Sequence, residues 1–283
     1  PLGTHTSFGR HIDEVFDATQ NKYVFRFISH VTNDNDVSTT STDRQRVEIK
    51  TYASSPANMK GTVGETVNYK WRFKLPTGFQ PSPNFTHIHQ IKAVGGDESD
   101  PIFTLTVRKA TPNRVELRYD QSAVSSAYNL ATANLSLFED QWVEVTETVF
   151  VHPVSGTYSI VIKRLSDNLT LINYTNSNVL TIRSDNTFIR PKWGIYRSLI
   201  NIQDLRDEEV LFSDFSVVEG VLSTSQFENS VVLLFSTIVE DALVFNTHFD
   251  KEIKFKIYNL VGQEIKSFNT NGQQPIDISE IST

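Results

Sequence analysis

The sequence predicts an all-β protein, a sandwich or β-jelly roll over residues 21–220 followed by a small C-terminal β module. Short segments rich in β-branched and aromatic residues alternate with Gly, Pro, Asn and Asp turn signals along most of the chain. No segment shows an amphipathic helical period of any length. With 283 residues, the chain has room for one large β domain and a smaller second unit.

Composition narrows the classes of function. The hydrophobic fraction of 39% is typical of a globular protein, and the formal net charge of -7 argues against a nucleic-acid partner. The absence of cysteine excludes a disulfide framework and a thiolate metal site, while it leaves the redox compartment open. No segment approaches the roughly 20 apolar residues that span a bilayer, so no membrane partner is expected.

The N-terminal region begins with an expected arm, residues 1–20, which includes a short helical turn at 11–16. Residues 23–28 are strand-like, and the Asn/Asp/Ser/Thr-rich run 33–43 predicts a loop. The strand expected at 44–52 separates its side chains by charge. Arg44, Arg46, Glu48 and Lys50 fall on one face, and Val47 and Ile49 fall on the other. This charged face is either a solvated sheet edge or the floor of a cleft.

Two further strands differ in how they distribute polar residues. The strand at 67–75 alternates regularly and turns Tyr69, Trp71 and Phe73 inward. The strand at 85–92 carries polar atoms on both faces, including His87 and Gln90. Burying an unpaired polar side chain costs roughly 1–3 kcal/mol, which favours a binding cleft at this strand.

The remaining strands of the large domain follow at short intervals. We expect them at residues 102–108, 114–119, 141–151, 158–163, 169–174, 190–197 and 209–218. The acidic loop 95–101 contains Asp97, Glu98 and Asp100, whose oxygens could hold Ca²⁺ or form a solvated acidic turn.

The strand at 190–197 is the candidate centre of function. Period-two geometry puts Arg190, Lys192, Gly194 and Tyr196 on one face and turns Trp193 and Ile195 the other way. We expect the first group to line a site, with a polymer approaching the backbone at the glycine. A linker is expected at 221–230, before a short β module at 231–283.

Three segments in order resemble the motifs of jelly-roll polysaccharide lyases, the group of alginate lyases, heparin lyase I and glucuronan lyase. Residues 46–50 resemble their Arg-x-Glu-x-Arg strand, 89–92 their Gln-Ile-His strand and 192–196 their Lys-x-Gly-x-Tyr strand. Residues 90–117 resemble a bacterial subgroup that includes a jelly-roll ulvan lyase. The resemblance implies a concanavalin-like jelly roll that cleaves an anionic, uronate-containing polysaccharide.

The resemblance implies β-elimination, with Tyr196 as the acid. The implied catalytic set is Tyr196, Gln90, Arg46, His89 and Lys192. In it, Gln90 donates its amide to the uronate carboxylate, Arg46 or a histidine adds positive charge there, and Lys192 places a cation near the phenol. Lys92 stands where these lyases have a histidine, and a lysine with an ordinary pKa near 10.4 is a poor base at neutral pH. The base is therefore Tyr196, His87 or His89.

The implied substrate contacts are Arg44, Glu48, Lys50, His87, Lys92, Arg190 and Arg197, although Arg197 faces away in an unbroken strand. Ulvan is favoured as substrate, with glucuronan, alginate or a heparin-like glycan as alternatives. Elimination requires no cofactor. A structural Ca²⁺ is considered at Asp97, Asp100 and, by analogy with related sandwich domains, Asp214.

The C-terminal module carries a second resemblance. Residues 255–265 and 276–279 resemble the sorting domain of Bacteroidetes type IX secretion, although the usual Pro-Asn-Pro is replaced by residues 236–241 and the final strand is missing. This partial sorting domain implies a secreted or cell-surface protein that contacts the secretion machinery.

The main rival is a non-catalytic carbohydrate-binding module or lectin-like sandwich, which would share the fold and the aromatic content. A binding module has no need of a Tyr/Lys/Gln/Arg cluster. A glycoside hydrolase is less favoured because it uses two carboxylates on one bond, and the expected cleft strands offer Glu48 without a clear partner.

Overall fold

The computed structural model describes residues 8–31, 41–122, 126–220, 242–243, 252–258, 264–271 and 274–279. The chain divides into two compact units, Pro1–Ser223 and Thr224–Thr283. The boundary between them falls inside the expected linker 221–230, whose residues lie outside the described ranges, as do most residues of the expected loop 33–43.

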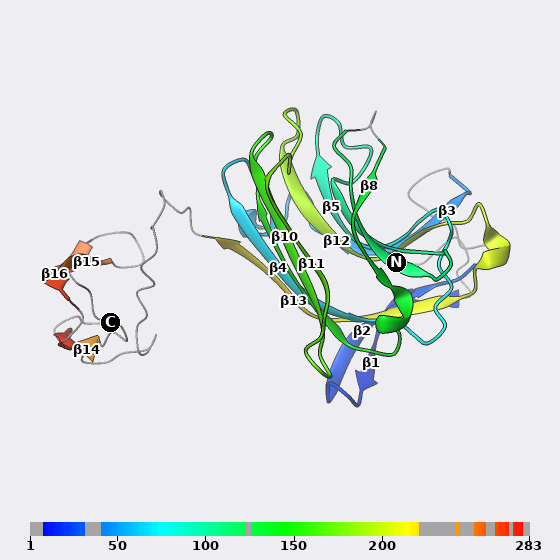
Figure 1. The fold of residues 1–283 in the computed structure, drawn as a ribbon, viewed down its shortest axis with the longest axis horizontal. Coiled ribbons are helices and arrows are strands. Elements are labelled where there is room, and N and C mark those ends of the chain that lie inside the picture. Colours follow the sequence, from blue (N-terminus) through cyan, green and yellow to red (C-terminus); the bar gives the residue numbers. More distant parts are fainter. Residues whose placement is uncertain are drawn as a thin grey trace. The chain divides into compact units, whose positions relative to one another are not determined.

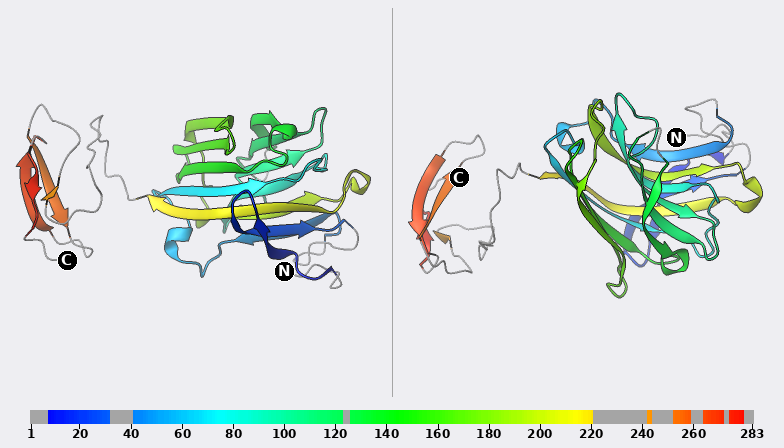
Figure 2. Two further views of the ribbon diagram at one scale, coloured as in Figure 1. Left: turned by 90° about the horizontal axis from the view of Figure 1, so that it is seen from below. Right: turned by 45° about the horizontal axis from the view of Figure 1, so that its top comes forward.

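The first unit is a sandwich of two antiparallel sheets, which Figures 1 and 2 show as stacked layers. One sheet has seven strands in the order β1 (Ile12–Asp17), β2 (Lys22–Ser29), β13 (Glu208–Gly220), β4 (Thr66–Lys74), β9 (Val143–Phe150), β10 (Gly156–Arg164) and β11 (Thr170–Val179). The other has six strands in the order β3 (Arg44–Lys50), β12 (Phe188–Ser198), β5 (Thr86–Val94), β6 (Phe103–Arg108), β7 (Arg114–Tyr119) and β8 (Tyr128–Asn134). Three 3-10 turns, η2 (Ala57–Met59), η3 (Leu135–Leu137) and η4 (Ile202–Asp204), lie in connections. The predicted all-β jelly roll is confirmed.

Alternating side chains build the core between the two sheets. On β4, Tyr69, Trp71 and Phe73 are fully buried, as predicted, and each aromatic side chain contributes about 1.5–3 kcal/mol through burial. Trp193 and Ile195 of β12 are buried in the same core. The inner face of the six-stranded sheet is therefore largely apolar, and most of the polar side chains lie on its other face.

One expectation for this unit was wrong, and one strand was not expected. Residues 11–16 do not form a helical turn in an arm, because Ile12–Asp17 pairs with β2 in the register Ile12↔Phe27. Strand β8 was not expected, because its sequence lacks a clear alternation and most of its side chains are partly or fully exposed. It forms because β7 offers a free edge to hydrogen-bond.

The second unit contains two small antiparallel pairs in its described residues. Strand β14 (Ala242–Leu243) pairs with β17 (Ile276–Asp277), and β15 (Ile253–Tyr258) pairs with β16 (Glu264–Thr270). No helix in the described part of the chain is both long and apolar enough to cross a membrane.

Candidate active site

The face of the six-stranded sheet that turns away from the core is called here the polar face. The register places one side chain from each successive strand in a row across it: Arg46, Tyr196, His87, Thr106 and Glu116. A second row contains Lys50, Lys192, Gln90, Thr104 and Arg118. Segments that are distant in sequence therefore meet on one surface.

Tyr196 lies between two guanidinium groups. Arg44 donates from Nη1 to the phenol oxygen at 3.3 Å, and the Arg46 Cζ atom lies 4.2 Å from the centre of the Tyr196 ring. The ring centroid of His87 lies 5.8 Å from that of Tyr196, and the ring centroid of Phe85 lies 5.1 Å from that of Tyr196.

His87 is the histidine that shares the polar face with Tyr196. Burial lowers its pKa to about 3, with help from the positive charges of Arg108 and Arg118. The imidazole is therefore neutral at physiological pH. Its Nδ1 atom is buried without a hydrogen-bond partner in the described part of the chain.

His89 was predicted as a catalytic residue facing the substrate, and the structure places it elsewhere. A register shift between His87 and His89 turns His89 into the space between the sheets. There its Nε2 atom lies 2.8 Å from Glu147 Oε2, its Nδ1 atom lies 3.0 Å from the Lys192 carbonyl, and Tyr158 donates to Glu147 at 2.6 Å. His89 is thus a core residue that links the two sheets behind the polar face.

A buried carboxylate, Glu48, collects the polar groups beside Tyr196. Gln90 donates its amide to Glu48 Oε1, Arg46 Nε lies 3.5 Å from Oε2, and Lys192 Nζ lies 3.8 Å from the same oxygen. Burial raises the pKa of Glu48, and burial lowers the pKa of Lys192 to about 8. Lys192 was expected to supply the cation at the phenol, but the contacts to Tyr196 come from Arg44 and Arg46.

Gly194 has a role in strand packing that was not expected. Its φ is 145°, and a Cβ atom there would lie 2.0 Å from the carbonyl oxygen of Val47. The missing side chain lets β12 approach β3, which places Arg46 beside Tyr196. The glycine therefore serves strand packing, and the approach of a polymer to its backbone stays a prediction.

The other predicted substrate contacts divide into two groups. Lys92 and Arg190 lie opposite each other on the polar face, where Lys92 donates to Ser99 O at 2.9 Å and Arg190 to Thr51 O at 3.1 Å. Lys50 is exposed at the end of β3. Arg197 faces the other side of the sheet and is fully buried, with hydrogen bonds to Gln45, Ser29 and Arg206, so it cannot contact a substrate.

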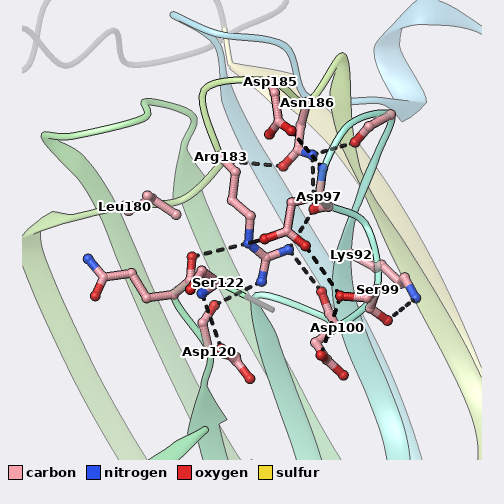
Figure 3. A network of polar contacts seen from close by, with 12 residues as sticks. Lys92, Asp97, Ser99, Asp100, Asp120, Ser122, Leu180, Arg183, Asp185 and Asn186 are labelled. Carbon is pink, nitrogen blue, oxygen red and sulfur yellow. Dashed lines mark hydrogen bonds and ion pairs between the residues drawn. The ribbon is translucent and has the colours of Figure 1, made fainter. Parts of the chain in front are cut away.

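Two of the acidic residues considered for Ca²⁺, Asp97 and Asp214, are paired with protein cations. Figure 3 shows Arg183 between the loops that carry Asp97, Asp100 and Asp120: it donates to the carbonyls of Asp97 at 2.9 Å and Asp100 at 3.0 Å and contacts the Asp97 carboxylate at 3.4 Å. Asp214 pairs with Lys22 and Arg72. Among the described residues, no group of three or more His, Cys, Asp or Glu side chains could hold a metal ion.

Sequence reasoning missed a second charged group on the polar face. Glu116 of β7 is fully buried and contacts Arg108, Arg114 and Arg118 at 3.2, 2.5 and 3.1 Å. The signal was present, because the stretch Arg114–Arg118 repeats the alternation of charges that was noticed in residues 46–50.

No protein-family model matches the sequence, and no curated protein matches it. Among solved structures, a family 7 alginate lyase variant in complex with product has a TM-score of 0.52 at 13% identity, covering 73% of this chain and 83% of its own. The alginate lyases from Klebsiella pneumoniae (TM-score 0.51, 10% identity, 73% and 84% covered) and Pseudomonas aeruginosa (0.50, 15%, 73% and 86%) are also similar. At this identity the similarity establishes the shared fold.

Proposed function

We propose that this chain is a polysaccharide lyase that cleaves a uronate-containing anionic polysaccharide by β-elimination. The observation that carries the proposal is the position of Tyr196, whose phenol oxygen accepts a hydrogen bond from Arg44 while Arg46 covers its ring. A structural tyrosine in a solvated sheet has no need of two guanidinium groups. The alginate lyases of similar fold include a tyrosine-to-phenylalanine variant crystallised with product.

In the proposed reaction, Tyr196 acts first as base and then as acid. The deprotonated Tyr196 oxygen removes the C5 proton of the uronate, and the electron pair moves onto the C6 carboxylate. Expulsion of O4 then forms the C4–C5 double bond as the Tyr196 phenol returns its proton to O4. The products are a 4,5-unsaturated uronate and a new chain end.

The groups beside Tyr196 suit the charge that develops on the substrate. The guanidinium of Arg46 can pair with the C6 carboxylate, and the neutral imidazole of His87 can donate a hydrogen bond to it as the enolate forms. The buried carboxylate of Glu48 contacts Arg46, Gln90 and Lys192 and holds them in position. Its burial keeps its charge away from the substrate.

Among uronate polymers we propose ulvan as the substrate. The support is the sequence resemblance to the bacterial subgroup and the number of arginines on the polar face, because the guanidinium fork suits sulfate as well as carboxylate. We also propose that the chain is secreted or held at the cell surface and that the C-terminal unit contacts the secretion machinery. That proposal rests on the resemblance of residues 255–265 and 276–279 to a sorting domain.

The test is an assay of the purified chain on ulvan, glucuronan, alginate and heparin, following the ultraviolet absorbance of the unsaturated uronate. We expect the fastest rise with ulvan and a loss of roughly 10³-fold in kcat for Tyr196→Phe, since removal of an acid–base group costs about 10²–10⁴-fold. Binding of ulvan to Tyr196→Phe should persist. Binding without product from any polymer would instead indicate a carbohydrate-binding module.

A further inference from the structure

The second charged group of the polar face, the arginines around Glu116, carries more positive charge than one buried carboxylate neutralises. One carboxylate, Glu116, is contacted by three guanidinium groups, those of Arg108, Arg114 and Arg118. A single ion pair would satisfy Glu116, so the cluster keeps excess positive charge. A bound anion would offset the repulsion among the three guanidinium groups.

The three arginines differ in how many contacts they make with the rest of the protein. Arg118 also donates to Asn129 at 2.7 Å and to the carbonyl of Ala127, which holds β8 in place. Arg114 pairs with Glu116 alone within the described part of the chain, and 41% of its side chain is exposed. Burial lowers the pKa of Arg108, and its neighbours Arg118 and Arg114 lower it further. An anion from solution would reach Arg114 first.

The cluster lies in line with Tyr196. Glu116 pairs with Thr106, Thr106 with His87, and His87 with Tyr196. Three strand spacings separate β12 from β7, which is about 14 Å, or roughly three pyranose units, since neighbouring strands lie about 4.8 Å apart. A polymer that crosses the strands at the level of Tyr196 therefore passes over the arginine cluster.

We propose that Arg108, Arg114 and Arg118 form a second anion-binding site that holds a carboxylate or sulfate group of the polymer, about three sugars from the bond at Tyr196. Glu116 orients the guanidinium groups and sets their spacing. This inference rests on the proposed function for the direction of the polymer. It predicts that affinity depends on the length of the oligosaccharide and on the anionic group that it carries at that distance.

The experiment measures binding without turnover, so that it remains informative if the chain has no lyase activity. Size-defined oligosaccharides from ulvan, before and after chemical desulfation, are titrated into Tyr196→Phe and into Tyr196→Phe/Arg114→Gln. We expect affinity to rise roughly tenfold once the oligosaccharide is long enough to reach β7, and the Arg114→Gln change to remove this rise. Affinity for shorter oligosaccharides should stay the same.

Arg164→Gln is the matched control, because Arg164 forms a surface ion pair with Asp167 on the other sheet. Thermal unfolding of each variant shows whether the fold is kept, and Arg108→Gln provides a second test of the cluster. A rise that disappears on desulfation identifies sulfate as the anion, and one that persists identifies carboxylate. Equal affinity of Tyr196→Phe and Tyr196→Phe/Arg114→Gln at every oligosaccharide length, or an equal loss of affinity at every length, would overturn the proposal.

Discussion

Arg46 and Tyr196 face each other across the β3–β12 ladder, and the guanidinium carbon lies 4.2 Å from the centre of the phenol ring. The contact holds a cation on the ring without blocking the phenol oxygen, which accepts its hydrogen bond from Arg44. Tyr196 therefore has one cation at its face and one at its oxygen. This pairing is the basis for the first prediction.

Arg46→Lys keeps the charge but removes the planar group from the ring. We expect kcat to fall roughly tenfold, because a cation–π contact contributes about 0.5–2 kcal/mol and the ammonium cannot match the fork geometry. Initial rates on the preferred polymer measure the effect, with Arg164→Lys on the other sheet as the control. An Arg46→Lys enzyme as fast as wild type would show that the ring contact does not assist the phenolate.

Substitutions at the two histidines of β5 should have different consequences. His87→Gln removes a group beside Tyr196, so we expect a large loss of kcat with little change in stability. His89→Gln breaks a buried pair with Glu147, which should lower the free energy of unfolding by about 3–5 kcal/mol.

Denaturant unfolding and initial rates, measured on both variants, separate the two roles. The pH profile of wild type adds a second test, because the pKa of His87 is lowered to about 3. If Tyr196 is the base, no limb of the rate profile near pH 3 should disappear in His87→Gln. Loss of such a limb would make His87 the base.

Much of the fold was predictable because strand alternation is a local property. The inward aromatics of β4 and the division of β12 into a core face and a polar face follow from a period of two. The meeting of Arg46, Gln90 and Tyr196 on one face was predicted from the family resemblance. The structure agrees with this grouping, since adjacent strands carry the three residues.

The rest depends on contacts that alternation does not encode. The direction of His89 is set by a register shift against β6, which depends on the pairing of two strands and not on the sequence of one. The contacts of Glu48 with Gln90 and Lys192 depend on how deeply the three side chains are buried together. The cluster around Glu116 was readable as alternating charges, but Arg108 joins it from the neighbouring strand β6.

Lys192 should make stability depend on pH in the alkaline range. Its pKa is lowered from 10.5 to about 8 in the folded chain, chiefly by burial. Between these two values the unfolded chain binds more protons than the folded chain, so the free energy of unfolding rises as pH rises. Relative to Lys192→Met, wild type should gain about 3 kcal/mol from pH 8 to pH 10.5. Urea unfolding of both proteins across this range measures the difference in their free energies of unfolding. A difference that does not change with pH would mean that the pKa of Lys192 is the same in the folded and unfolded chains.

Gly194→Ala tests whether the approach of β3 to β12 builds the site. A Cβ atom at Gly194 would lie 2.0 Å from Val47 O and 2.7 Å from Glu48 Cα, in addition to the strain of a φ of 145°. Gly64→Ala is the matched control, because Gly64 has a φ of 94° but no atom within 4 Å of the added Cβ. We expect Gly64→Ala to cost about 1–3 kcal/mol, which is strain alone, and Gly194→Ala to cost several kcal/mol more because two backbones must separate. Any folded Gly194→Ala protein should also lose activity, since the separation moves Arg46 away from Tyr196. Equal losses of stability in the two variants, measured by denaturant unfolding, would show that strand contact at Gly194 does not hold the Arg46–Tyr196 pair together.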